Sequence, residues 1–185
     1  CSSCNTPIGL RYPLVEALTG LLSLLVVWHF GATAQALTAL VLTWGLVALT
    51  VIDLDEQLLP DQLTLPLMWL GLLVNLDGMF VDLHSAVIGA AAGYLSLWLV
   101  FQVFRLVTGR EGMGYGDFKL LAVFGAFLGW QILPLVILLS SFIGAVVGIT
   151  LIVARGRDRQ IPIPFGPYLA AAGFVALLWG EQINR

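Results

Sequence analysis

The chain has 185 residues, of which 59% are hydrophobic and only 10% are charged, and its formal net charge is −3. Its mean hydropathy of +0.98 excludes a water-soluble domain, because too little polar material is present to cover the exterior of such a fold. The eight basic residues are scattered without forming a patch, which argues against binding to nucleic acid. We therefore expect the lipid bilayer to surround this protein, and we expect no nucleic-acid partner.

Glycines, prolines and charged residues divide the chain into about seven apolar stretches, each close to the roughly 17–25 residues that a membrane-crossing helix needs. None of them alternates with the period of two that a transmembrane barrel requires. The sequence therefore predicts an all-α, polytopic transmembrane helical bundle of about seven spans. These spans run over residues 12–30, 34–52, 62–79, 84–107, 117–131, 134–154 and 162–180.

The basic residues predict the orientation of these spans. If seven spans alternate across the bilayer, all basic residues except Arg185 fall on one side, and excess positive charge marks the cytoplasmic face. Those on the common side are Arg11, Arg105, Arg110, Lys119, Arg155, Arg157 and Arg159. We therefore expect a membrane protein whose residues 1–11, 53–62, 105–117 and 155–161 face the cytoplasm.

Two carboxylates lie at the predicted cytoplasmic ends of apolar stretches. Asp53 ends the second stretch, and Asp117 begins the fifth. Two carboxyl groups that share one proton can hydrolyse a peptide bond without a metal, since one accepts a proton from water while the other donates to the carbonyl oxygen. The alternatives are purely structural roles, in which Asp117 caps the following helix and Asp53 belongs to a solvated loop end.

Further residues near these carboxylates are candidates for shaping a site. Gly114 and Gly116 precede Asp117, and glycine permits positive φ and close approach of another backbone. Lys119 either acts on the charge of Asp117 or extends to lipid headgroups. Asp61 follows a proline and precedes an apolar run, which is typical of a helix cap. In the last stretch, Pro162, Pro164 and Pro167 predict either a bent segment that shapes a groove or a plain helix entry.

Four ordered segments resemble the bacterial type IV prepilin peptidases. They are RYPLVEALTG at 11–20, IDLDEQLLPDQLTLPLMWLGLLVN at 52–75, EGMGYGDFKLLAVFGAFLGW at 111–130 and IPFGPYLAAAG at 163–173. The Gly-Tyr-Gly-Asp element at 114–117 is also similar to the GxGD signature of related membrane aspartyl proteases. This resemblance implies that Asp53 and Asp117 are the catalytic aspartates.

The resemblance also implies substrates and a cofactor. Family members cleave the leader peptide of type IV prepilins and type II secretion pseudopilins at the cytoplasmic membrane face. They then typically methylate the new N-terminus with S-adenosylmethionine, whereas the proteolysis needs no cofactor. On this basis we expect a transmembrane peptidase domain over residues 12–185, in the bacterial inner membrane and with its active site facing the cytoplasm.

The first residues depart from the pattern of the family. Members usually carry two Cys-x-x-Cys pairs in a cytoplasmic loop that follows an additional helix, and this chain has a single pair, Cys1 and Cys4. A structural zinc usually takes four protein ligands, so these cysteines are either half of a zinc site or inert thiols. We expect residues 1–11 to be the remnant of that Cys-containing loop, in a chain cut from something longer.

Two other classes of function compete with the peptidase. A proton-coupled membrane transporter would use its carboxylates as a proton relay, but it would more often show repeats and acidic residues at mid-membrane. A structural membrane scaffold would leave the glycine-rich turn before Asp117 without a purpose.

Overall fold

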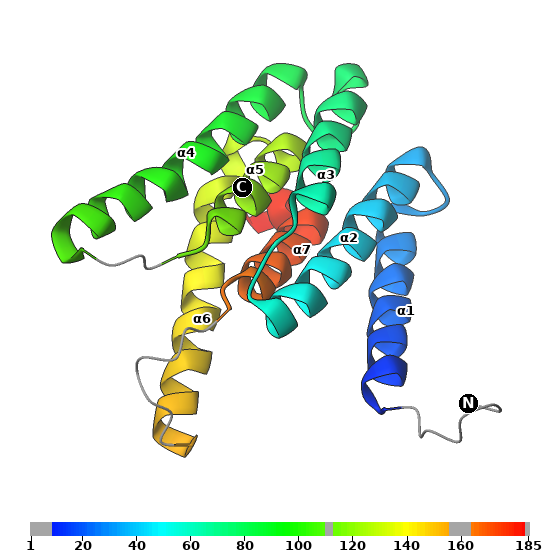
Figure 1. The fold of residues 1–185 in the computed structure, drawn as a ribbon. Coiled ribbons are helices and arrows are strands. Elements are labelled where there is room, and N and C mark those ends of the chain that lie inside the picture. The colour runs from blue at the N-terminus through cyan, green and yellow to red at the C-terminus, as the bar shows by residue number, and fades with distance from the viewer. Residues whose placement is uncertain (1–8, 110–112, 156–163, 184–185) are drawn as a thin grey trace.

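The computed structural model describes residues 9–109, 113–155 and 164–183. Within these ranges every regular element is helical, which confirms the all-α prediction (Figure 1). The α-helices are α1 (Arg11–Phe30), α2 (Ala34–Glu56), α3 (Asp61–Val74), α4 (Leu83–Thr108), α5 (Tyr115–Leu128), α6 (Leu133–Arg155) and α7 (Gly166–Ile183). Two short 3-10 helices, η1 (Asn75–Asp77) and η2 (Trp130–Ile132), follow α3 and α5.

The helices differ in how well their lengths suit a bilayer. In the described part of the chain, four stretches are long and apolar enough to cross it: Arg11–Phe30, Ala34–Glu56, Leu83–Thr108 and Trp130–Thr150. Helices α3 and α5 have only 14 residues each, and the apolar part of α7 covers Gly166–Gly180. The α-helices predicted over 62–79 and 117–131 end early, because α3 gives way to η1 and α5 stops at Gly129, whose φ is 80°. These apolar helices are those of a membrane protein.

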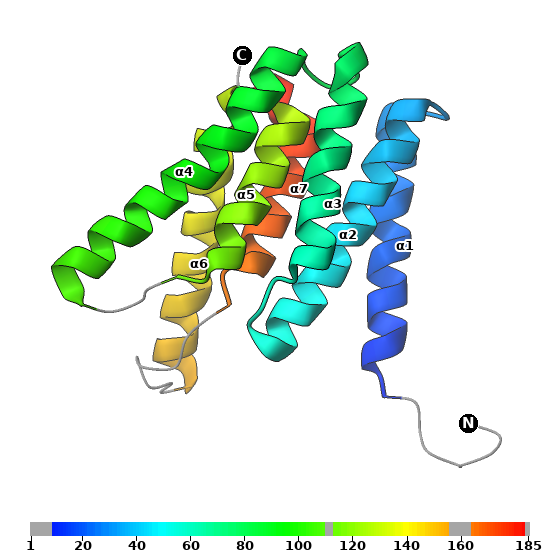
Figure 2. The same cartoon turned by 45° about the horizontal axis from the view of Figure 1, so that its top comes forward.

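Helix α5 lies at the centre of the bundle. Figure 2 shows it between α3 and α4, with α7 behind. Every residue from 120 to 127 is buried, so this helix is apolar all round. A Cβ placed on Gly125 would lie 2.0 Å from the carbonyl oxygen of Gly89 on α4. The backbones of α4 and α5 therefore touch, a close approach that small residues at a helix contact allow.

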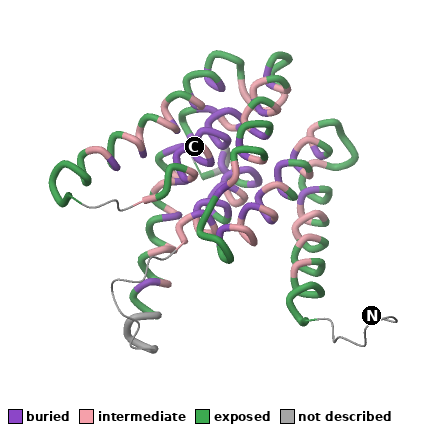
Figure 3. The backbone as a smooth tube through the Cα atoms, viewed as in Figure 1, coloured by how far each residue is buried: buried purple, intermediate pink, exposed green. Residues whose placement is uncertain are grey.

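The outer helices present apolar side chains to the surroundings. Figure 3 shows long exposed and half-buried stretches on α1, α4 and α6. Within α1, which is described in full, Val26 alone is buried, and the helix packs on α2. The large exposed side chains of these helices include Leu14, Leu24, Leu99, Phe104 and Phe142. Such exposure is unfavourable in water and favourable in lipid, in agreement with the composition.

The bundle has two ends with different chemistry. At one end α2 finishes and α3, α5 and α7 begin, and the predicted carboxylates lie here. At the other end, the Thr33 hydroxyl and the Asp82 carboxylate accept from the amides of Ala36 and Ser85 and so cap α2 and α4. The capped helix starts and the two carboxylates therefore lie at opposite ends of the bundle.

Candidate active site

Asp53 lies in the last turn of α2 and is only 5% exposed. Its neighbours Leu54 and Asp55 are exposed, so the carboxylate is buried by the bundle and not by its own turn. The helix ends at Gln57, which adopts a left-handed conformation with φ 54° and donates its amide to the carbonyl oxygen of Asp53 at 3.0 Å. Asp53 is therefore part of a helix, and the solvated-loop interpretation is wrong.

Asp117 is the third residue of α5 and is also 5% exposed. The N-cap residue of this helix is Gly114, so Asp117 is not the cap, and that alternative is wrong as well. The amide of Asp117 donates to the carbonyl oxygen of Gly114 at 3.3 Å. The residues that follow, Phe118 and Leu120, are fully buried, and they place the carboxylate at the boundary of the core.

The two carboxylates share one pocket of about 820 Å³. Its wall includes the end of α2, the 57–60 linker, the first turns of α3 and α5, and the segment before α7. Both carboxylates are buried, and they face this one pocket from different helices. All six residues that the sequence predicts as catalytic or site-shaping line this pocket: Asp53, Asp61, Gly114, Gly116, Asp117 and Lys119.

The glycines before Asp117 act through space and not through unusual backbone angles. Gly114 has φ −78° and Gly116 lies in helix α5, and neither is among the described glycines with positive φ, so of the two properties that glycine permits, positive φ is not used here. A Cβ on Gly116 would lie 2.6 Å from the Cβ of Leu59. The close approach predicted for this turn is therefore made by the linker between α2 and α3.

Asp61 and Lys119 form an ion pair at the wall of the pocket. The Lys119 Nζ donates to Asp61 Oδ1 at 2.5 Å and so joins the first turns of α3 and α5. Asp61 is the first residue of α3 and Pro60 is its N-cap, so the prediction that Asp61 caps the helix is wrong in detail. A carboxylate in the first turn is still favoured by the helix dipole. The partly exposed pair contributes little to stability, but it places one charge of each sign beside the buried carboxylates.

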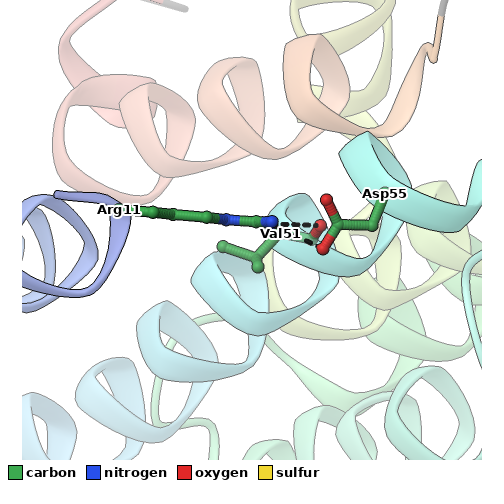
Figure 4. A network of polar contacts seen from close by, with 3 residues as sticks. All are labelled: Arg11, Val51 and Asp55. Atoms are coloured by element: carbon green, nitrogen blue, oxygen red, sulfur yellow. Dashed lines mark hydrogen bonds and ion pairs between the residues drawn. The ribbon is translucent and has the colours of Figure 1, made fainter. Parts of the chain in front are cut away.

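A second ion pair fastens α1 to the turn of α2 that carries Asp53. The guanidinium Nη2 of Arg11 donates to Asp55 Oδ2 at 2.6 Å and reaches the carbonyl oxygen of Val51 at 3.5 Å (Figure 4). The carbonyl groups in the last turn of a helix are stabilised by a cation. The start of α1 is thus tied to the end of α2, within two residues of a site carboxylate.

Sequence reasoning missed one direct contact in this site. The amide of Gly166, the first residue of α7, donates to Asp53 Oδ2 at 3.0 Å. The proline-rich entry to the last helix was predicted to bend the chain or to begin a helix, and Pro164 and Phe165 do line the pocket. Pro162 lies outside the described residues. The Pro-Phe-Gly-Pro sequence at 164–167 indicated a helix entry, but it did not predict that the Gly166 amide would contact Asp53.

Another pocket, of about 620 Å³, lies at the opposite end of the bundle. Its polar walls come from His29, Gln35, Asp82, Ser85 and Gln131, at the capped ends of the helices. It is remote from both carboxylates and lacks a second acidic partner for Asp82 within its described wall. It is therefore not the site of the predicted chemistry.

The predicted zinc ligands cannot be placed, because Cys1 and Cys4 lie outside the described residues. Within the ranges that the structure does describe, no group of three or more His, Cys, Asp or Glu residues could hold a metal ion. The half zinc site stays a prediction of the sequence.

Comparison with known proteins supplies the family. The profile of the type IV leader peptidase family matches residues 40–149, and that of the bacterial peptidase A24 N-terminal domain matches residues 1–30. The chain belongs to the type IV leader peptidase family. The match to this family includes Asp53, Asp117 and the whole of α3, α4 and α5. No solved structure matches the chain.

Individual members of the type IV leader peptidase family are similar over the full chain. The chain is 63% identical over 185 residues to the prepilin leader peptidase/N-methyltransferase of Pseudomonas aeruginosa, and it covers 64% of that protein. It is equally identical to the protein of the same name from Aeromonas hydrophila, again covering 64%. The corresponding protein of Legionella pneumophila is 50% identical over 183 residues, which are 99% of this chain and 64% of that protein. The chain therefore spans slightly less than two thirds of the relatives that it matches.

Proposed function

We propose that this chain is the peptidase part of a membrane aspartic endopeptidase that cleaves the leader peptides of type IV prepilins and type II secretion pseudopilins. The observation that carries the proposal is the pair of buried carboxylates, Asp53 and Asp117, which face one pocket from different helices. Relatives at 63% identity are named prepilin leader peptidase/N-methyltransferase, in agreement with this chemistry.

The carboxyl pair acts as a unit that holds one proton. Two like charges at close range do not both ionise, so the pair is a monoanion when it is ready to react. The ionised member accepts a proton from water as the water oxygen attacks the peptide carbonyl carbon. The protonated member gives its proton to the carbonyl oxygen, which forms a neutral diol. The carboxyl group that now carries a proton gives it to the leaving nitrogen, and the other carboxylate takes a proton from one hydroxyl of the diol. The C–N bond then breaks, and the pair is again a monoanion with its proton in the starting position.

The proposed site faces the cytoplasm, in a bundle whose seven helices all cross the membrane. The described basic residues support this orientation, since Arg11, Arg105, Lys119 and Arg155 lie near helix ends on the side of the carboxylate pocket. A basic leader peptide is retained on that side of the membrane by the same charge rule. A transporter would place its carboxylates deeper and give them access to both faces, whereas this pocket lies at one end of the bundle.

We further propose that the full-length protein methylates the new N-terminus with S-adenosylmethionine, as the names of the relatives imply. Neither described pocket fits this cofactor as its site. One pocket holds the carboxyl pair that the peptide must reach, and the other lies at the opposite end of the bundle. We therefore assign no residue of this chain to methyl transfer.

The test uses the full-length protein in detergent with a prepilin as substrate. Asp53→Asn and Asp117→Asn each remove an ionisable group while keeping the shape of the side chain, and we expect each to lower kcat by about 10²–10⁴-fold. Asp77→Asn is the matched control, because Asp77 is exposed in η1 at the opposite end of the bundle. Cleavage at the wild-type rate by a folded Asp53 or Asp117 variant would show that the carboxyl pair is not the catalyst.

A further inference from the structure

The start of α7 makes a direct contact with the candidate dyad. Gly166 donates its amide hydrogen to Asp53 Oδ2 at 3.0 Å, across 113 positions of the sequence and in a buried setting. The amides at the start of a helix carry partial positive charge and favour an anion in front of them. A backbone donor bonded to a carboxylate stabilises its ionised form.

This contact depends on glycine at position 166. A Cβ there would lie 2.6 Å from Asp53 Oδ2 and 3.2 Å from Leu59 Cδ2. Leu59 also packs against Gly116, next to the other carboxylate. One buried leucine thus lies between the two glycines that allow α5 and α7 to approach the end of α2, so no side chain can be added at position 166 without moving Asp53 or the linker.

The two carboxylates have different surroundings. Asp53 is next to exposed residues at the end of α2, whereas the residues after Asp117 are in the core. Gly114, the N-cap residue of α5, lies near Asp117, since a Cβ on Gly114 would be 3.8 Å from Asp117 Oδ2. Other charged groups near the pair are accounted for by ion pairs or exposure: Arg11 with Asp55, Lys119 with Asp61, and the exposed Glu56 on α2. Before and at the start of α7, Pro164, Phe165 and the amide of Gly166 face this site, and none of these residues has a charged side chain.

We propose that the Gly166 amide is a positioning group that keeps Asp53 as the ionised, water-activating carboxylate and leaves the proton of the pair on Asp117. This assignment rests on the proposed peptidase function. Asp53 then removes the proton from the attacking water, and Asp117 protonates the carbonyl oxygen of the peptide. In the second half of the reaction, Asp53 returns its proton to the leaving nitrogen and Asp117 takes back one proton from the diol.

The first test compares two glycine variants on α7 in the full-length protein. Gly166→Ala displaces the amide from Asp53, so we expect kcat to fall at least about tenfold and the acid limb of the pH–rate profile to move up by about one pH unit. Gly180→Ala is the control, because its Cβ meets only the end of the Ile132 side chain, at 2.6 Å, and the neighbouring Ala176. It should keep the wild-type profile. A Gly166→Ala enzyme with an unshifted acid limb would overturn the proposal, whatever its rate.

The second test needs neither substrate nor a folded Gly166→Ala protein. Infrared spectra of protein with ¹³C-labelled aspartate are recorded against pH for Asp117→Asn and Asp53→Asn. We expect the carboxylate band that Asp53→Asn removes from the wild-type spectrum, which belongs to Asp53, to persist to lower pH than the band that Asp117→Asn removes. The reverse order would overturn the assignment while leaving the peptidase intact, whereas wild-type cleavage by both variants would refute the peptidase itself.

Discussion

Replacing Asn75 by leucine should destabilise the protein more than any other change of a single amide side chain in the described ranges. Asn75 is fully buried in η1. Its Nδ2 donates to the carbonyl oxygens of Ala126 and Phe127 at 2.9 and 3.0 Å, and its Oδ1 accepts from the amides of Phe80 and Val81 at 2.9 and 3.2 Å. These four bonds use every donor and acceptor of the side chain. They join the end of α3 to the end of α5 and to the turn before α4.

The magnitude follows from the number of bonds that are lost. A buried hydrogen bond contributes about 1 kcal/mol net, so the Asn75→Leu variant should lose about 4 kcal/mol of stability. For a chain of this size, 1 kcal/mol corresponds to about 2–4 °C, and the midpoint of thermal unfolding should fall by about 8–16 °C. The leucine also leaves the two carbonyl oxygens at the end of α5 without a side-chain donor, which removes the restraint on the helix that carries Asp117.

The assay is thermal unfolding of the purified protein in one detergent, followed by the circular dichroism of the helices. Gln35→Leu is the matched control, because the half-buried Gln35 gives a single bond, from its Nε2 to the carbonyl oxygen of Met79 at 3.1 Å. This variant should lose only about 1 kcal/mol. If both variants unfold within about 2 °C of each other, the role of Asn75 as a four-bond clamp is refuted.

Three further predictions concern backbone strain, helix packing and acid stability. Gln57→Gly should raise the free energy of unfolding by about 0.5–1 kcal/mol, because glycine adopts the left-handed conformation at the end of α2 without a Cβ penalty; chemical unfolding in mixed micelles measures it. Gly125→Ala should lower the free energy of unfolding by about 3 kcal/mol, because the added Cβ would meet the backbone of Gly89. Its control, Gly20→Ala, lies in open space on α1 and should be neutral or stabilising in the same measurement. Hydrogen bonds from the hydroxyl and the amide of Ser85 hold the pKa of Asp82, outside the span, below its ordinary value. The stability that this cap adds is present at neutral pH and is lost as pH falls through the folded-state pKa. The Asp82→Asn variant should therefore show a weaker fall of the thermal unfolding midpoint on the acid side of a plot against pH.

Much of the architecture follows from local patterns in the sequence. The stretch predicted over 84–107 is α4 at Leu83–Thr108, because its apolar run begins after a capping aspartate and ends at a glycine in the left-handed conformation. Asp53 and Asp117 were predictable as a pair because each lies at the edge of an apolar run and the basic residues put both edges on one side. These signals are carried by neighbouring residues, so one sequence is enough to find them.

The unpredicted features depend on contacts between distant segments. Asn75 looked like one more residue of a span predicted over 62–79, but four bonds to two other segments end α3 just before it. Gly166 gave no sign of its partner, since Asp53 lies 113 residues away. The glycines at 114 and 116 indicated a close approach, but the local sequence did not reveal that Leu59 is the residue that approaches Gly116. In each case the cause is tertiary packing, which overrides what the local residue type favours.

Helix length explains why two carboxylates can be buried at one end of a membrane bundle. At 1.5 Å per residue, α2 is about 35 Å long and α5 is about 21 Å, against a hydrocarbon core of about 30 Å. Helix α5 is by itself shorter than this core, so its first turn, with Asp117, lies recessed between longer neighbours; Figure 2 shows α6 continuing past the start of α5. Both carboxylates are only 5% exposed in this recess, while the Asp61–Lys119 pair remains partly exposed at its wall. The leader peptide of the proposed substrate can enter such a recess from the aqueous side in extended form and so reach the carboxyl pair.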